Sequence, residues 1–300
     1  MPCYEIEFPL ADLEATAVEA ALEATGALSV TFTDRGDEPV LEPRLGEVRL
    51  WSDTQVRALF DATSDAAANL GQLSAALGPR ITREARVRRV EDQAWERAWL
   101  VDWKPLRFGS RLWVVPTEAP APMQPDAVVV RLDPGLAFGT GTHPTTALCL
   151  EALGHIALAG GTVIDYGCGS GLLGIAALKL GAREVLAIDL DPQALLATAA
   201  NAARNGVAAR LRTALPGAAP APAGCVLANI LAGTLVELAG TLAAACRPGG
   251  TLLLSGILSG QAATVAAAYA AGFELVRTTH RDDWCCLEAR RRDAVARAGR

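Results

Sequence analysis

The 300-residue chain has few histidines and no regularly spaced cysteines. It contains three histidines, and no two of its seven cysteines have C-x-x-C spacing, so we expect no metal site. An odd number of irregularly spaced cysteines is typical of free thiols in a reducing compartment. For the adjacent Cys285 and Cys286 we expect two thiols on opposite faces of a strand rather than a disulfide.

The sequence also lacks the features of a secreted or membrane protein. Residues 1–7 contain no basic stretch followed by an apolar run, so no signal peptide is expected. The longest apolar region, residues 223–246, includes Asn229, Glu237 and three glycines, which favours a strand followed by a buried helix over a membrane span. We therefore expect a cytoplasmic protein without a membrane partner.

Charge is unevenly distributed along the chain, whose net charge is −6. Residues 1–78 contain fourteen acidic and four basic side chains, whereas residues 80–111 contain five acidic and nine basic ones. An acidic N-terminal unit is poorly suited to reading nucleic acid directly and well suited to docking a basic protein. The alternative interpretation is that the acidic surface only keeps this domain soluble.

The N-terminal 90 residues show the pattern of a ferredoxin-like α+β domain. The predicted order is β-α-β-β-α-β, which is a binding fold without chemistry of its own. The predicted strands cover residues 4–10, 28–33, 47–51 and 81–90, and the predicted helices cover residues 12–24 and 52 or 53 to 77.

A Trp-rich segment follows this domain. Trp95, Trp99 and Trp103 recur every four residues, which predicts a linker helix with one aromatic stripe. The stripe either packs against a domain or serves as a surface for a partner. We assign residues 91–112 to the linker.

Residues 113–300 alternate apolar strands with helices, which indicates an α/β domain with a mostly parallel sheet. The predicted strands are residues 162–166, 184–188, 225–228, 250–255, 273–278 and 284–288, and the predicted helices are residues 171–180, 192–205, 232–246 and 259–271.

A glycine-rich turn marks the predicted cofactor site. The buried strand 162–166 leads into Gly167-Cys168-Gly169-Ser170-Gly171 and then into a helix. Asp189 lies 22 positions after Gly167, at the tip of the next strand, where a carboxylate suits ribose hydroxyls. The G-x-G-x-G spacing, together with Asp165 in the preceding strand, favours S-adenosyl-L-methionine over NAD. A nicotinamide dehydrogenase remains an alternative.

Two further segments supply polar groups near this turn. Residues 132–146 contain four threonines, three glycines, two prolines and His143, and their hydroxyls and amides suit the amino-acid end of the cofactor. We interpret His143 as a helix-start residue rather than a general base. Asn229 ends the strand 225–228, at the sheet edge where ligands bind. Its carbonyl can accept a hydrogen bond from a substrate amine, and it can also cap the helix that follows.

Residues 132–146, 163–171 with 188–192, and 228–233 together resemble the PrmA family, bacterial methyltransferases that modify the eleventh protein of the large ribosomal subunit. The Gly-Thr-Gly-Thr-His-Pro-Thr-Thr run is the most specific part of a resemblance that spans nearly the whole chain. It implies a class I (Rossmann-like) methyltransferase domain in residues 113–300, preceded by the linker and by a ferredoxin-like substrate-docking domain in residues 1–90. Cofactor-binding positions carried over by this resemblance are Thr146, Gly167, Asp189 and Asn229.

The resemblance also implies the reaction. The family methylates lysine side chains and the N-terminal amine of its basic protein substrate. From its place at the strand end, we expect Asn229 to orient that amine. The Asn229 segment lacks the Pro-Pro-aromatic sequence of many amine methyltransferases, so its contacts with the amine can differ. We expect a monomer. Two alternatives are a small-molecule methyltransferase with a dimerising first domain and a non-catalytic ribosome-associated binding protein.

Overall fold

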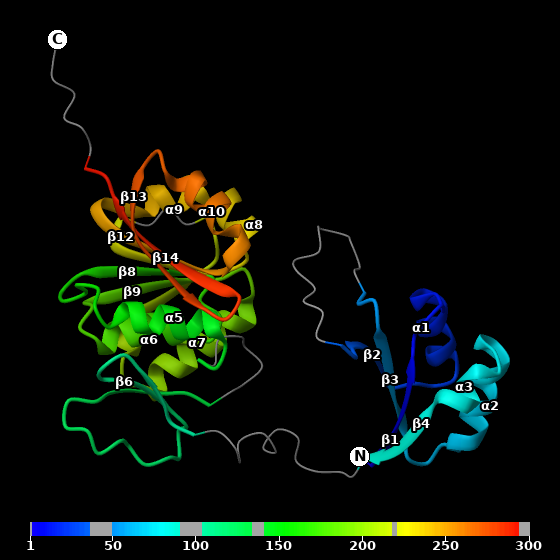
Figure 1. The fold of residues 1–300 in the computed structure, drawn as a ribbon. Coiled ribbons are helices and arrows are strands. Elements are labelled where there is room, and N and C mark those ends of the chain that lie inside the picture. Colours follow the sequence, from blue (N-terminus) through cyan, green and yellow to red (C-terminus); the bar gives the residue numbers. More distant parts are fainter. Residues whose placement is uncertain (1, 37–49, 91–103, 134–140, 218–220, 294–300) are drawn as a thin grey trace. The chain divides into compact units, whose positions relative to one another are not determined.

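The computed structural model describes residues 2–36, 50–90, 104–133, 141–217 and 221–293. The chain forms two compact units, Met1–Val101 and Asp102–Arg300 (Figure 1). The predicted Trp-rich helix lies outside the described residues, so that helix and the proposed limits of the linker stay predictions.

The N-terminal unit contains a four-stranded antiparallel sheet in the order β2-β3-β1-β4. The order of elements along the chain is the predicted β-α-β-β-α-β with one short helix added, so the ferredoxin-like architecture is confirmed. Even-numbered side chains of β1, Tyr4, Ile6 and Phe8, lie in the core with Val18 of α1 and Phe60 of β3. The elements are β1 Cys3–Pro9, α1 Ala15–Ala24, β2 Ser29–Asp34, β3 Thr54–Asp61, α2 Ala66–Leu77, α3 Arg80–Glu84 and β4 Arg86–Val90.

Three predictions for this unit were wrong in part. Residues 54–61 form strand β3, not the start of a helix, and residues 50 and 51 lie outside any strand. Val56, Ala58 and Phe60 alternate with more exposed residues and pack in the core with side chains of α1 and α2, while the backbone pairs with β1 and β2. The helix begins only at Ala66, after Asp65 caps it. The last strand starts at Arg86, because residues 80–84 form α3.

The C-terminal unit is built on a seven-stranded sheet in the order β10-β9-β8-β11-β12-β14-β13. All pairs are parallel except those of β14, which runs antiparallel to both neighbours. The order reverses between β8 and β11, which creates the crevice where doubly wound sheets bind ligands. The strands are β8 Thr162–Tyr166, β9 Glu184–Ile188, β10 Leu211–Ala214, β11 Ala223–Asn229, β12 Cys246–Leu258, β13 Phe273–Arg281 and β14 Trp284–Arg291.

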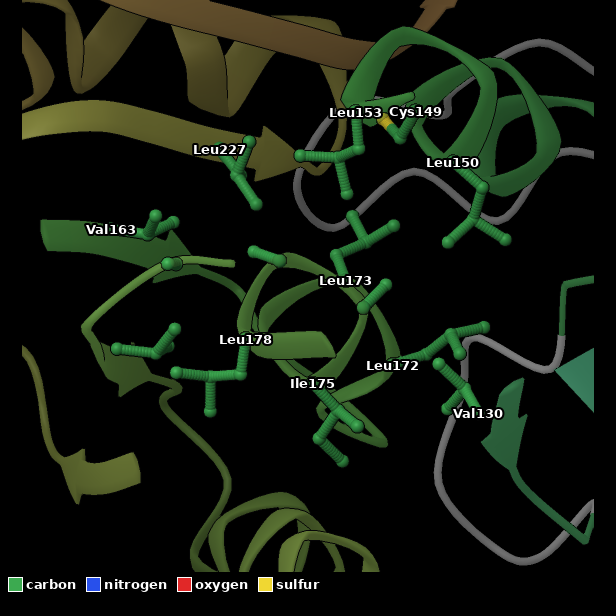
Figure 2. Close-up of a cluster of buried hydrophobic side chains, with 14 of the residues drawn as sticks. Val130, Cys149, Leu150, Leu153, Val163, Leu172, Leu173, Ile175, Leu178 and Leu227 are labelled. Atoms are coloured by element: carbon green, nitrogen blue, oxygen red, sulfur yellow. The ribbon is translucent and has the colours of Figure 1, made fainter. Parts of the chain in front are cut away.

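Helices cover both faces of this sheet (Figure 1). In Figure 2, Leu172, Leu173, Ile175 and Leu178 project from α6 in different directions, and Leu173 points toward Leu153. A second cluster fills the opposite face. On one face lie α5 Pro144–Leu153, α6 Leu172–Lys179 and α7 Pro192–Arg204, and on the other lie α8 Ala232–Glu237, α9 Ala239–Ala245 and α10 Ala262–Tyr269.

The adjacent cysteines show how the sheet separates its two faces. Cys286 belongs to the cluster beneath α5 and α6, and Cys285 to the cluster beneath α8 and α10. All seven cysteines are unbridged. The prediction of two thiols on opposite faces of one strand is therefore confirmed.

Several elements escaped the sequence analysis. A small sheet in the order β5-β6-β7 packs beside α6 and comprises Leu106–Phe108, Leu112–Val115 and Val128–Arg131. The short edge strand β10 was also missed. The single helix expected over residues 232–246 is two helices that meet at Leu238. Within the described residues no helix combines the length and apolar character needed to cross a membrane.

Candidate cofactor and substrate site

The glycine turn that follows β8 adopts a backbone conformation that only glycine adopts easily. Gly167, Gly169 and Gly171 have φ values of 76°, 53° and 78°. A Cβ on Gly171 would lie 2.8 Å from Thr198 Cγ2, and a Cβ on Gly167 would overlap Ile230 Cγ2. These glycines therefore permit both the tight turn and the close approach of neighbouring elements.

The backbone amides of this turn bond mainly within the chain. A phosphate-binding loop instead directs its N–H groups at the ligand. The turn is thus a poor seat for a pyrophosphate, which argues against NAD, and its amides serve mostly to shape the site. The donors and acceptors are Gly167 N and Cys168 N to Ile188 O (2.7 and 3.0 Å), Gly169 N to Asp189 Oδ2 (2.8 Å), Gly171 N to Cys168 O (2.8 Å) and Leu172 N to Ser170 Oγ (3.3 Å).

Helix α7 holds the turn from the side. Thr198 Oγ1 donates to Gly169 O at 3.0 Å, and Asn201 Nδ2 donates to Ser170 O at 2.8 Å. Both side chains are buried. The sequence analysis missed them, although buried polar residues at 198, 201 and 205 recur about one helical turn apart, a pattern that could have indicated a supporting role.

Asp189 lies where the sequence placed it, directly after β9 and beside the glycine turn. Its Oδ2 accepts from Gly169 N and its Oδ1 accepts from Asp191 N at 3.0 Å. The side chain is half-buried, so two backbone donors fix it at the sheet edge. Each carboxylate oxygen has a second lone pair for a hydroxyl donor, so this group fits a ribose.

Asp165 lies below the turn rather than on the ligand side. Its side chain is 1% exposed, and its Oδ2 accepts from Gly174 N in α6 at 2.8 Å. Its Oδ1 has no hydrogen-bond partner. Burial raises the pKa of this carboxyl to about 7, the Gly174 N–H lowers it in part, and the Asp189 charge raises it. Asp165 therefore supports the first turn of α6.

Thr146 and Asn229, 83 positions apart, meet in the structure. Asn229 Nδ2 donates to Thr146 Oγ1 at 3.3 Å. Thr146 is buried in the first turn of α5, and Asn229 is half-buried at the end of β11. The N-cap position of α8 is Leu231, two residues beyond Asn229. Two of the four predicted site residues are thus in direct contact at the carboxyl edge of the sheet.

Strand β12 supports the contact between Thr146 and Asn229. Ser255 is fully buried, pairs with Asn229 in the sheet and donates through Oγ to Thr145 O at 3.1 Å. Gly256 has a φ of 81°, and a Cβ there would overlap the carbonyl oxygen of Ile230. Neither residue was predicted, because nothing in the local sequence shows that Ser255 reaches Thr145, 110 positions away, or that Gly256 touches Ile230.

His143 is the N-cap residue of α5, as expected for a helix-start residue. Its Nδ1 lies 2.8 Å from Thr145 Oγ1, and its ring makes an edge contact with Trp284 at a centroid distance of 4.9 Å. The middle of the Thr-rich loop, residues 134–140, lies outside the described residues. In the part of the chain that the structure covers, no group of three or more His, Cys, Asp or Glu side chains could hold a metal ion.

The strand ends therefore gather Gly167, Asp189 and Asn229 at one edge of a doubly wound sheet. A family model described as ribosomal protein L11 methyltransferase (PrmA) matches residues 2–292 of this chain. The chain belongs to the PrmA family. The resemblance seen in the sequence is thereby confirmed.

Individual members of the PrmA family match large parts of this chain. A ribosomal protein L11 methyltransferase from Azotobacter vinelandii is 51% identical, with 97% of this chain and all of the relative covered. One from Pseudomonas aeruginosa is 50% identical, with 97% and 99% covered. The crystal structure of a ribosomal protein L11 methylase from Lactobacillus delbrueckii subsp. bulgaricus is 33% identical, with a TM-score of 0.57, 63% of this chain and all of that chain covered. These matches confirm the class I methyltransferase fold.

Proposed function

We propose that this PrmA-family protein uses S-adenosyl-L-methionine to methylate lysine side chains and the N-terminal amine of ribosomal protein L11. The match to relatives named for this activity supports the assignment of the reaction and the substrate protein. The chemistry of the amine acceptor rests on the site. When bound, the cofactor supplies a methyl carbon whose bond to sulfur breaks with its electron pair left on sulfur, and the amine that gains the methyl releases a proton.

The contact between Asn229 and Thr146 is the observation that carries this proposal. Because Asn229 Nδ2 donates to Thr146, the amide carbonyl is the atom that can accept from a substrate amine. An N–H of the amine held in this way directs the nitrogen lone pair along a defined line. Such alignment supplies about 7 kcal/mol or more of barrier reduction in well-oriented reactions.

The remaining site residues would hold and shape the cofactor. Asp189 would accept hydrogen bonds from ribose hydroxyls, since its two backbone contacts fix its orientation. Gly167 would allow close approach to the turn, and Thr146 would keep the Asn229 amide in place. No residue is required as a dedicated general base, because a poorly hydrated site lowers the pKa of an ammonium group and favours its neutral form.

Intact-mass analysis of purified, unmodified L11 tests this function. After incubation with enzyme and S-adenosyl-L-methionine, we expect the mass to rise in whole methyl steps, and fragmentation should place the methyl groups on lysines and the N-terminal amine. Asn229→Ala should reduce the rate roughly tenfold to a hundredfold, as loss of a hydrogen bond to the reacting group predicts, while its unfolding curve stays close to wild type.

The alternatives give different results in the same experiment. L11 that stays unmodified, with labelled methyl groups appearing on small molecules of a cell extract, would favour a small-molecule methyltransferase. Cofactor binding without transfer to any acceptor would favour a non-catalytic binding protein. Either result would overturn the proposed function.

A further inference from the structure

Positive charge gathers at the edge of the seven-stranded sheet that lies opposite the candidate site. We call this edge, where the parallel strands begin, the amino edge. Because β14 runs antiparallel to β12, its last residues lie here, where Arg290 pairs with Thr251 and Arg291 with Phe273. Four arginines form what we call the amino-edge cluster: Arg247 near the start of β12, Arg290 and Arg291 at the end of β14, and Arg292 directly after it.

The cluster carries more positive charge than its neighbours balance. Arg291 is half-buried, and the other three arginines are exposed. Among the described residues none of the four forms an ion pair, although Glu274 lies opposite Arg290 in the sheet and Asp293 directly follows the cluster. The net charge of the chain is −6, so a patch of four unpaired arginines departs from its average charge.

Two of the arginines converge on one point. Burial raises the pKa of the Cys246 thiol to about 11, and the charges of Arg291 and Arg247 lower it in part, because both guanidinium groups lie near this sulfur. The Arg291 guanidinium also lies over the Phe273 ring at 5.5 Å, and its buried Nη1 has no hydrogen-bond partner in the described part of the chain. A buried N–H without an acceptor is costly, so an anionic oxygen beside it would stabilise this arginine.

Stabilisation of helix ends is the competing explanation for basic residues at this edge. Lys179 and Arg204 occupy the last turns of α6 and α7, where a positive charge interacts favourably with the helix C-terminus. Arg247 follows α9 and fits the same explanation. Residues 290–292, however, lie at the end of a strand, so a helix dipole does not account for three of the four arginines.

We propose that the amino-edge cluster binds the phosphate backbone of RNA without reading its sequence. The choice of RNA among polyanions rests on the proposed function, because the substrate is a ribosomal protein, which assembles with RNA. Guanidinium groups match phosphate oxygens in bidentate geometry, and phosphate contacts position a protein without specifying sequence. Neighbouring strands lie about 4.8 Å apart, so the arginines of β12 and β14 are spaced to contact one phosphate or two successive ones. The opposite edge, with Asn229, stays free for the protein substrate.

Fluorescence anisotropy with a labelled single-stranded RNA of about 20 nucleotides and mixed sequence tests this site. The cluster variant replaces the three exposed arginines and keeps the half-buried one: Arg247→Gln, Arg290→Gln and Arg292→Gln. The matched control removes three exposed positive charges in and beside β5: Lys104→Gln, Arg107→Gln and Arg111→Gln. Urea unfolding and methylation of free L11 show whether both variants are folded and active.

At 0.05 M NaCl we expect the cluster variant to bind this RNA at least tenfold more weakly than wild type, and the control to bind within about twofold of wild type. The slope of log affinity against log salt concentration should become about two units shallower in the cluster variant, since each phosphate contact on a single strand contributes about 0.7. Both variants should methylate free L11 as wild type does.

Equal RNA affinity of the two variants would overturn the proposal, because any loss would then reflect net charge alone. It would also be overturned if the wild type bound no RNA, or bound anionic phospholipid vesicles more tightly than RNA. These results leave L11 methylation, and with it the proposed function, intact. Failure of the wild type to methylate L11 would instead overturn the proposed function, while RNA binding is measured independently of it.

Discussion

Asp189 and Asp191 are two carboxylates at the tip of β9 with different partners. Asp189 accepts from Gly169 N in the glycine turn, whereas Asp191 caps α7 by accepting from Gln193 N at 2.8 Å. We predict that Asp189→Ala weakens binding of S-adenosyl-L-methionine about tenfold to a hundredfold, because it removes a charged hydrogen-bond acceptor. Isothermal titration calorimetry measures this affinity.

Asp191→Ala is the matched control for that measurement. It should cost about 1 kcal/mol of stability through loss of the helix cap and leave cofactor affinity close to wild type. Equal affinity of D189A and wild type would contradict the assignment of Asp189 to the ribose.

Asp165 should make stability depend on pH in the direction opposite to a salt-bridged carboxylate. Its pKa is about 7 in the folded protein and about 3.9 in an unfolded chain. The stabilising contribution of Asp165 to the free energy of unfolding is therefore fully present below about pH 4. It is lost as pH rises to about 7, a change on the order of 4 kcal/mol. Asp165→Asn keeps an acceptor for Gly174 N and has no charge to bury.

Urea unfolding of wild type and D165N between pH 5 and pH 8 tests this prediction. The free energy of unfolding of D165N minus that of wild type should increase with pH up to about 7 and then level off. Two parallel stability curves would show that Asp165 does not titrate in this range.

At the scale of elements, close backbone contact with β12 holds the end of β11 and the residue that follows Asn229. Gly256→Ala places a Cβ against the Ile230 carbonyl in a left-handed conformation, so we expect a loss of about 2 to 4 kcal/mol and slower methyl transfer. Gly260→Ala is the control, because nothing lies within 4 Å of its Cβ position. Urea unfolding should show the control within about 0.5 kcal/mol of wild type, and similar losses in both variants would contradict the argument.

Elements with strong local patterns were predicted closely. The apolar run before Gly167 predicted strand β8 at 162–166, where the structure has it. The glycine at the start of α6 predicted that helix to within one residue at each end. Strand β3 was missed because its residues are ambiguous locally, and pairing with two neighbouring strands decides its form. The break at Leu238 and the edge strand β10 likewise depend on packing rather than on propensity.

The convergence of the candidate site residues was predictable from the sequence, and the residues that support them were less so. Gly167, Asp189 and Asn229 each follow a predicted strand, so the parallel sheet brings them to one edge. Ser255, by contrast, reaches Thr145 across 110 positions, and no local pattern encodes that distance. The hydrogen bond between Thr146 and Asn229 likewise became visible only once the fold joined α5 to β11.

At the scale of the whole molecule, opposite charges should help a basic protein substrate to bind. The excess of acidic residues in 1–78 predicts that raising the NaCl concentration from 0.05 to 0.3 M lowers kcat/KM for L11 about three- to tenfold, mainly through KM. Steady-state kinetics over this salt range provides the measurement.

Two sets of charge-neutralising variants locate the effect. Changing the exposed Glu14, Glu19 and Glu23 beside and on α1 to Gln should flatten the salt dependence. The same change at the exposed Glu118, Glu237 and Glu274 of the C-terminal unit should leave it as in wild type. If the second set flattens the dependence instead, the N-terminal unit is not the docking surface.

The distribution of sulfur offers a practical route to following that docking. Six of the seven cysteines are buried, and only Cys3, on the N-terminal unit, is partly accessible to solvent. Burial also raises the pKa of Cys168 to about 12, so this thiol stays protonated and unreactive within the glycine turn. A maleimide fluorophore should consequently attach to the native protein at a single position. Its emission would then report substrate capture in real time without any engineered cysteine.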